Sequence, residues 1–195
     1  MSETTPTDRP LDEQVRFEIV DEVAWITIDR PEKGNALSPP CRNRIRDLIN
    51  ELNGSYAARA IVLTAAGDKL FCPGADLSHR VPSERPEGVP ERAVGDARRM
   101  MLDGQYTLFP AILDSELPII AAVNGTAAGM GAHLAFACDL VIAAEGTKFI
   151  EVFSRRGLVV DALGAYLLPR TIGLHKAKEL VLFADDLPVA EAERL

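Results

Sequence analysis

The sequence predicts an α/β protein whose core is a largely parallel sheet. Two alternating apolar runs, Val15–Val20 and Val23–Ile28, indicate a β-hairpin. An amphipathic helix and a short apolar strand follow the hairpin, an order that is typical of parallel α/β units. The segment 118–145 then adds two apolar runs on either side of a glycine-rich turn and a short apolar helix.

The elements of the first half have clear local signals. Ser38 is placed as an N-cap with Pro39 at the first helical position, and apolar residues at helical spacing carry this helix to about residue 53. Residues 60–64 are apolar throughout and predict a buried strand. Residues 71–77, FCPGADL, predict a glycine turn that enters a possible helix.

The second half alternates in the same way. We expect a loop over residues 81–90, which could act as a lid, and one helix with a methionine-rich apolar stripe over residues 93–116. Further predicted elements are buried strands at 119–123 and 140–144, a strand at 148–153, helices at 163–169 and 174–183, a turn at 185–188 and the start of a helix at 189.

Length and composition predict one domain. Residues 1–11 are polar and form an expected flexible lead-in, and residues 12–195 form the core, with 47% apolar residues in the whole chain. The net charge of −8 argues against nucleic acid or an anionic membrane as the main partner. Cys41, Cys72 and Cys138 lack metal-ligand spacing and cannot all pair, so together with the polar start they predict a protein of the reducing cytoplasm.

The central glycine turn, Gly129-Met130-Gly131, is the strongest candidate for chemistry. Glycine lets a backbone approach a ligand closely, and the first N–H groups of a helix have no intrahelical partner. Such groups can hold a developing negative charge. The backbone N–H of Met130 is the candidate donor, and Ala75, in the turn at 71–77, offers a second one.

Three other interpretations of the central segment remain open. Residues 117–138 carry no Asp, Glu, Lys or Arg and could mimic a membrane span, although the Asn-Gly turn interrupts it. The Gly-x-Gly pattern after a strand could bind a dinucleotide, but Leu134 stands where the third glycine belongs. A tight turn in a buried core would show the same local pattern.

Four stretches resemble, in order and spacing, the crotonase or enoyl-CoA hydratase/isomerase family: VAWITIDRPEKGNAL, IVLTAAGDKLFCPGADL, PIIAAVNGTAAGMGAHLAFACDLVIAAEGTKF and GLVVDALGAYLLPRTIGLHKAKEL. The resemblance implies a spiral of ββα repeats that binds an acyl-CoA thioester and forms a trimer or a dimer of trimers. It implies no metal or redox cofactor, with coenzyme A entering as part of the substrate. It also implies C-terminal helices that this chain lacks.

The same resemblance assigns roles to residues. The thioester oxygen would lie between the amides of Ala75 and Met130, where Met130 replaces the family's usual glycine but keeps its N–H. A phosphate of coenzyme A could meet Lys33 or Arg30, although a solvated charge is the simpler expectation for either one. The residues expected to line the coenzyme A site are Lys33, Asn35, Ala36, Gly74, Asp76, Leu77 and Gly129.

The catalytic side chains depart from the family pattern. Hydratases of the family use two glutamates, and here those places hold His133 and Phe153. Glu151 lies two residues before Phe153, so a regular strand would turn both to one face. His133 is a candidate general base or, alternatively, a hydrogen-bonded core residue.

Asp161 is the candidate proton carrier, because some family members with isomerase or related activity have a functional aspartate at this place. In a halide-displacing branch such an aspartate attacks as a nucleophile. The alternative is a helix N-cap.

The leading hypothesis is an enzyme that hydrates, dehydrates or isomerises an enoyl-CoA. A catalytically silent acyl-CoA-binding protein is the second hypothesis, and a dinucleotide-dependent reductase is the third. Zinc-type spacing, a phosphate-binding Gly-Lys-Ser/Thr loop and a Gly-x-Ser-x-Gly elbow are all absent from the sequence.

Overall fold

The computed structural model describes residues 9–78, 88 and 95–195. Its first sheet has the strand order β1-β2-β3-β5-β7, in which β1 and β2 form an antiparallel hairpin and every other pair is parallel. The largely parallel sheet predicted from the sequence is therefore confirmed. Its strands are β1 (Val15–Val20), β2 (Val23–Ile28), β3 (Ala60–Ala65), β5 (Ile119–Val123) and β7 (Leu140–Ala143).

A second sheet has the order β4-β6-β8-β9, parallel except for its last pair. Its strands are β4 (Leu70–Cys72), β6 (Thr126–Ala128), β8 (Lys148–Ile150) and β9 (Asp186–Pro188). The sequence analysis missed β6, and its turn at 185–188 is wrong because β9 pairs with β8 there. Strands of three residues are too short to show a clear alternation of apolar and polar side chains.

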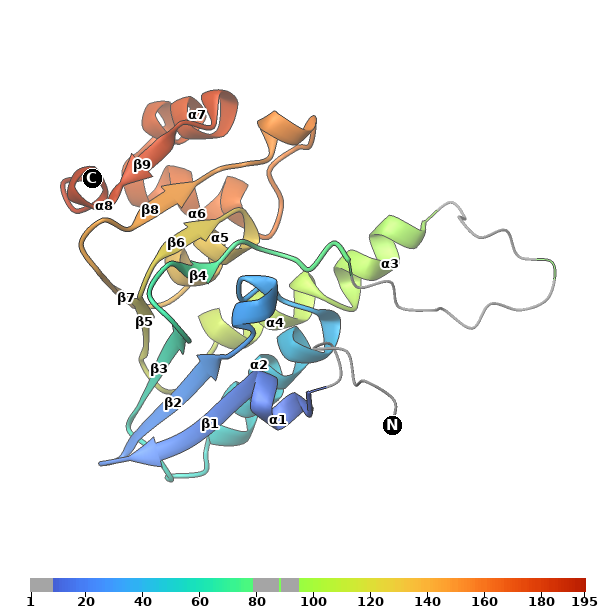
Figure 1. Cartoon of the computed structure of the whole chain (residues 1–195), viewed down its shortest axis with the longest axis vertical. Coiled ribbons are helices and arrows are strands. Elements are labelled where there is room, and N and C mark those ends of the chain that lie inside the picture. The colour runs from blue at the N-terminus through green and yellow to red at the C-terminus, as the bar shows by residue number, and fades with distance from the viewer. Residues whose placement is uncertain (1–8, 79–87, 89–94) are drawn as a thin grey trace.

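The helices and 3₁₀ turns of the described residues are α1 (Leu11–Gln14), η2 (Pro31–Lys33), α2 (Pro39–Leu52), α3 (Asp96–Leu102), α4 (Gln105–Leu113), α5 (Met130–Phe136), η3 (Ser154–Arg156), α6 (Gly164–Ile172), α7 (Leu174–Phe183) and α8 (Val189–Ala192). The predicted cap of α2 is confirmed, since the Ser38 side chain accepts from the Cys41 amide. α2 and α4 lie along one side of the five-stranded sheet (Figure 1). α5 contacts strands of both sheets and α6.

Two helix predictions need correction. The single helix expected over 93–116 is wrong for the part that the structure describes. Two separate helices, α3 and α4, lie there, and Asp103 and Gly104 stand between them. The helix expected after the 71–77 turn does not begin within its described part, where Ala75 instead forms an isolated parallel bridge with Leu37. The loop predicted at 81–90, apart from Gly88, lies outside the described residues.

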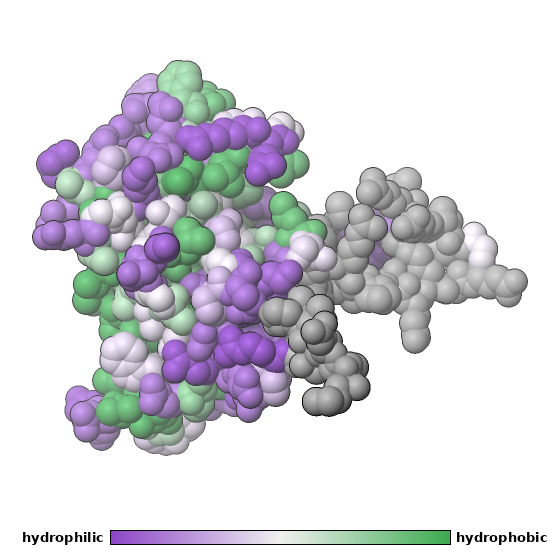
Figure 2. Space-filling model, in the orientation of Figure 1, coloured by the Kyte–Doolittle hydropathy of each residue, from purple (hydrophilic) through white to green (hydrophobic). Residues whose placement is uncertain are grey.

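The burial predicted for β7 is also wrong. β7 is the last strand of its sheet, and Leu140, Val141 and Ile142 are 61%, 42% and 67% exposed. Further large apolar side chains are exposed on α7, where Leu182 and Phe183 are 66% and 69% exposed. Figure 2 shows a hydrophobic area at the top of the molecule, where Figure 1 places α7.

The apolar segment 117–138 does not form one long helix. It divides into β5, β6 and the seven-residue α5. Within the described ranges, no helix has both the length and the apolar character needed to cross a bilayer. The membrane-span interpretation of this segment is therefore wrong, since a span needs about 20 consecutive helical residues.

Candidate active site

The two glycine turns lie side by side. β4 and β6 are parallel neighbours, so their carboxyl ends point the same way and each runs into one of the turns. A Cβ atom placed on Gly74 would lie 3.3 Å from the Ala128 carbonyl oxygen and 3.5 Å from the Met130 nitrogen. Gly74 has φ +109°, a conformation that favours glycine. Positions 75 and 130 are thus brought together from distant parts of the chain.

Gly131 brings α5 into direct contact with the end of β4. A Cβ atom there would lie 2.0 Å from the carbonyl oxygen of Cys72 and 2.6 Å from its carbonyl carbon. Both atoms belong to the backbone, which cannot rotate away as a side chain can. Glycine at this position therefore fixes how closely the start of α5 approaches the first turn.

The amides of Ala75 and Met130 have no acceptor among the described residues. Met130 is the first residue of α5, so its N–H has no acceptor within the helix. The Gly74 carbonyl and the Asp76 amide both bond to Leu37 at 2.9 Å, so the Ala75 N–H is directed to the opposite side of this extended segment. Among the hydrogen bonds of the described residues, neither amide acts as a donor.

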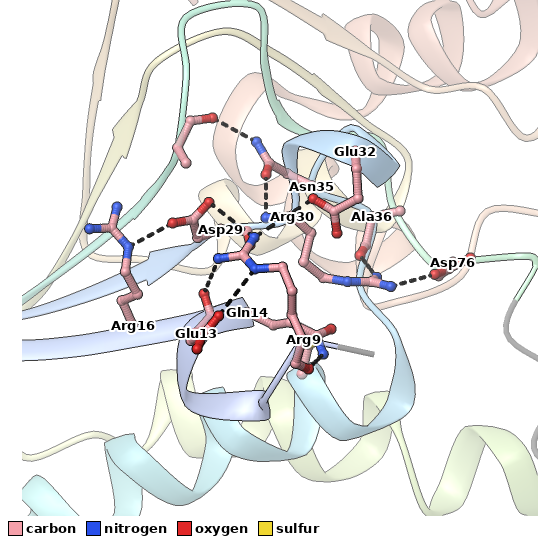
Figure 3. Close-up of polar contacts among 12 residues, drawn as sticks. Arg9, Glu13, Gln14, Arg16, Asp29, Arg30, Glu32, Asn35, Ala36 and Asp76 are labelled. Atoms are coloured by element: carbon pink, nitrogen blue, oxygen red, sulfur yellow. Dashed lines mark hydrogen bonds and ion pairs between the residues drawn. The ribbon is translucent and has the colours of Figure 1, made fainter. Parts of the chain in front are cut away.

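Arg30 and Asp76 form a buried ion pair behind the first turn. Nη2 of Arg30 donates to Oδ2 of Asp76 at 2.9 Å, and each side chain is 6% exposed (Figure 3). Nη1 of Arg30 donates to the carbonyl of Ala36, and the Ser78 amide and hydroxyl donate to Oδ1 of Asp76. The expectation that Arg30 is a solvated charge is therefore wrong.

Asn35 and Ala36 are buried beside the Arg30–Asp76 pair, and both bond to Arg30. Oδ1 of Asn35 accepts from the Arg30 amide at 3.0 Å, and its Nδ2 donates to the carbonyls of Ala66 and Leu70 at 2.9 and 2.8 Å. These bonds join the loop before α2 to the end of β3 and to β4. The hydrogen-bonding groups of the Asn35 side chain are therefore engaged within the protein.

Lys33 and Leu77 differ from the other residues that the family resemblance placed around coenzyme A. Lys33 ends η2 and is partly exposed, and Leu77 is 88% exposed. By contrast, Asn35, Ala36 and the carboxyl group of Asp76 are buried in the framework of the first turn. Lys33 and Leu77 are accordingly the side chains of this set that a ligand can reach.

The Arg30–Asp76 pair predicts a pH dependence of stability. Although burial opposes ionisation, hydrogen bonds from Ser78 and Arg30 lower the pKa of Asp76 from 3.8 to about 2. The unfolded chain therefore binds this proton more readily, and the pair contributes about 2 kcal/mol that is present above pH ~4 and lost as the pH falls to ~2. Urea unfolding between pH 6 and pH 2.5 is expected to show this loss in the wild-type chain.

Asp76→Asn is expected to abolish that component and to lower stability at pH 6, because it leaves the buried Arg30 without its counter-ion. Asp186→Asn is the matched control, since Asp186 pairs with Lys148 but its side chain is 36% exposed. An Asp76→Asn variant that loses as much stability on acidification as the wild type would contradict the assignment.

His133 and Glu151 form a second buried polar pair, which joins α5 to the residue after β8. Nε2 of His133 lies 2.9 and 3.0 Å from the two carboxylate oxygens of Glu151, and the residues are 0% and 4% exposed. The Phe153 ring stacks on the imidazole, with ring centroids 5.5 Å apart and an interplanar angle of 10°. The strand predicted over 148–153 is wrong beyond Ile150, where β8 ends, so Glu151 and Phe153 do not lie on a regular strand, although both contact His133.

Asp161 precedes α6 and is partly buried. Its Oδ2 accepts from Nε2 of Gln105 at 3.4 Å, and its Oδ1 is buried with no hydrogen-bond partner among the described residues. Burial is the main cause that raises the pKa of this carboxyl group above its usual 3.8. The N-cap alternative is wrong, because the N-cap of α6 is Leu163 and no side chain caps it.

The backbone beside Asp161 is strained. Ala162 and Leu163 have φ +46° and +62°, which non-glycine residues rarely adopt. The Ala162 amide donates to Oε1 of Gln105 at 3.1 Å. Gln105 thus holds both the carboxyl group and the following backbone, a role that the sequence analysis missed because Gln105 and Asp161 are 56 residues apart.

A cavity of about 730 Å³ lies elsewhere, between β7, α6 and α8, and none of the predicted site residues lines it. No cluster of three or more His, Cys, Asp or Glu side chains suited to a metal ion occurs in the part of the chain that the structure describes. The candidate site is thus defined by the two turns, by the His133–Glu151 pair and by Asp161.

Comparison with known proteins gives a consistent result. Residues 18–195 match the family model described as enoyl-CoA hydratase/isomerase. A probable enoyl-CoA hydratase of Rhodobacter capsulatus is 41% identical over 93% of this chain and 65% of that protein. The 1,2-epoxyphenylacetyl-CoA isomerase of Escherichia coli is 35% identical over 87% of this chain and 62% of its own length.

The crystal structure of a putative enoyl-CoA hydratase from Streptomyces coelicolor aligns with all of this chain and 69% of its own, with a TM-score of 0.82 and 36% identity. A probable enoyl-CoA hydratase/isomerase from Mycobacterium abscessus aligns with a TM-score of 0.81 and 31% identity. The chain spans between 62% and 65% of the two curated relatives named above.

Proposed function

Because the chain belongs to the crotonase, or enoyl-CoA hydratase/isomerase, family, we propose that it binds an acyl-CoA thioester and stabilises its enolate between the amides of Ala75 and Met130. The proposal is supported by the contact between the two turns and by their two amides, neither of which donates a hydrogen bond among the described residues. Removal of a proton alpha to a thioester places negative charge on the carbonyl oxygen. Fixed donors at that oxygen lower the barrier by several kcal/mol.

Asp161 is the proposed proton carrier. Its carboxylate takes a proton from the alpha or gamma carbon of an enoyl thioester, and the electron pair of that C–H bond moves onto the thioester oxygen as the dienolate forms. The same carboxyl group returns the proton at the other carbon, so the double bond moves and nothing is consumed. Its partial burial and its raised pKa suit a group that must both accept and release a proton.

Double-bond isomerisation is favoured over addition of water by the residues at the family's two glutamate places. His133 is fully buried and bonded to Glu151, and Phe153 offers no acid. Water addition through two carboxylates would need an acid at both places. The substrate class we propose is an enoyl-CoA, without a metal or redox cofactor and in a cytoplasmic homotrimer or dimer of trimers.

The second candidate is a catalytically silent acyl-CoA-binding protein. The replacement of both glutamates by His133 and Phe153 is the observation that favours it. Such a protein would bind a non-reactive acyl-CoA analogue tightly in calorimetry, and no product would form from any enoyl-CoA of a panel that varies chain length and double-bond position.

The enolate proposal is tested by Met130→Pro. Proline is tolerated at the first position of a helix, so this change removes the N–H while it keeps α5. We expect kcat on the best enoyl-CoA of the panel to fall about 100- to 1000-fold. Met130→Gly, which keeps the N–H, is the matched control and is expected to stay within a fewfold of the wild type. Equal activity of the proline variant would refute the role of this amide.

A further inference from the structure

The His133–Glu151 pair is a buried ionisable group that the proposed reaction does not use. Both carboxylate oxygens of Glu151 lie within 3.0 Å of the same ring nitrogen, Nε2 of His133, which is the arrangement of an N–H donor facing an ionised carboxylate. Nδ1 of the ring is buried and has no partner among the described residues. A buried carboxylate is costly unless a positive charge accompanies it. A doubly protonated, positively charged imidazole meets that need.

The pair is attached to the turn that carries Met130. His133 lies one turn after Met130 on α5, and its amide donates to the Gly129 carbonyl at 3.1 Å. Glu151 directly follows β8, whose Ile150 carbonyl accepts from the Gly129 amide at 2.9 Å. The segments that carry the two side chains therefore meet at Gly129, next to Met130.

α6 packs against the same imidazole. A Cβ atom on Gly164 would lie 2.2 Å from Cε1 of His133 and 2.3 Å from its Nε2. The Gly164 amide donates to the backbone carbonyl of Asp161 at 2.8 Å. The ring is thus fixed against the segment that carries the proposed proton carrier.

Charges near Asp161 come from this pair. After burial and the hydrogen bond from Gln105, the positive charge of His133 lowers the pKa of Asp161 and the negative charge of Glu151 raises it. Cys72 of β4 packs on α5, but burial raises its pKa to about 12, so it stays neutral. Among the described residues, neither Asp161 nor Glu151 forms an ion pair with Lys or Arg.

We infer that His133 is a positioning residue, held by Glu151 and Phe153, whose positive charge offsets Glu151 beside Asp161 and so keeps Asp161 ionised and able to accept a proton. The role of Asp161 as the base rests on the proposed function. The charge relation among the three residues does not, so the two can be tested apart.

His133→Gln is the informative change. The glutamine amide can still donate to Glu151, but the positive charge is gone, so Asp161 would face an uncompensated carboxylate. We expect the proton affinity of Asp161 to rise about tenfold. The double variant His133→Gln with Glu151→Gln removes both charges and is expected to return the proton affinity to within about threefold of the wild type. Phe153→Leu disturbs the ring contact without a change of charge and is the control.

Two measurements on the full chain give the titration midpoint of Asp161. Carbon-13 NMR of aspartate carboxyl groups, with the Asp161 signal assigned by its loss in Asp161→Asn, gives the titration midpoint even if no substrate is turned over. The pH profile of kcat/KM gives the same midpoint where turnover is found. A midpoint that His133→Gln leaves unchanged, or that Phe153→Leu moves equally, would overturn the inference.

The wild-type chain provides a test that needs no variant. Nitrogen-15 NMR of the His133 ring, recorded at the titration midpoint of Asp161, is expected to show both nitrogens protonated. A neutral ring would overturn the inference, whatever the variants do. Failure to turn over any enoyl-CoA, with the expected Asp161 titration intact, would instead count against the proposed function alone.

Discussion

Asp161→Asn is expected to lower kcat on an enoyl-CoA substrate by about 100- to 10,000-fold, the range that a positioned general acid–base contributes. Asparagine has nearly the same shape and can still accept from Gln105, so the change removes the ionisable group and little else. The measurement is steady-state turnover on the best substrate of the panel, with alpha-proton exchange in deuterated water as a second readout.

Stability separates a catalytic from a structural role for Asp161. Burial raises the pKa of this carboxyl group, so its ionised form is less favourable in the folded chain than in the unfolded chain, and this cost is present above its folded pKa. At pH 7 Asp161→Asn is therefore expected to melt at the same temperature as the wild type or higher. Full activity, or an equal loss of stability and activity, would argue against the proton-carrier role.

Gly131→Ala is expected to prevent the native packing of α5 on β4. The added methyl group would lie 2.0 Å from the Cys72 carbonyl oxygen, and relief requires the strand or the helix to move. We expect a loss of more than about 4 kcal/mol in the free energy of unfolding, observed as insoluble expression or as a large fall in the denaturation midpoint.

Gly146→Ala is the matched control for this loss. Gly146 has φ +81°, and a Cβ atom added there would meet nothing within 4 Å, so alanine costs only the backbone strain, about 1 kcal/mol. If Gly131→Ala were as stable as Gly146→Ala, the contact between the two glycine turns would be softer than the structure indicates. The placement of the Ala75 and Met130 amides would then lose its support.

Local signals explain what sequence analysis predicted well. The hairpin, the Ser38 cap and the two glycine turns each depend on residues within a few positions of one another. Such features follow from backbone preferences that the chain carries wherever it lies. The wrong predictions lie where neighbours in space decide the outcome, as at β7, the last strand of its sheet, whose Leu140, Val141 and Ile142 side chains are exposed.

The partners of the buried polar side chains could not be predicted from local sequence signals. Arg30 pairs with Asp76 from 46 positions away, and Gln105 holds Asp161 from 56 positions away. Glu151 and Phe153 both contact His133, but the end of β8 at Ile150 and the full burial of His133 as a partner of Glu151 gave no local signal. A charged residue in isolation gives no sign of whether its counter-ion lies beside it.

The sequence by itself determined the family, the alternation of strands and helices, and the two glycine turns, because these depend on residue order and on glycine at fixed places. The tertiary structure alone decided that the turns meet, that Asp76 forms a buried ion pair with Arg30, and that His133 and Glu151 are buried together beside the segment of Asp161. The physical reason is that burial and charge pairing are set by what packs against a residue, and those neighbours are distant in the chain.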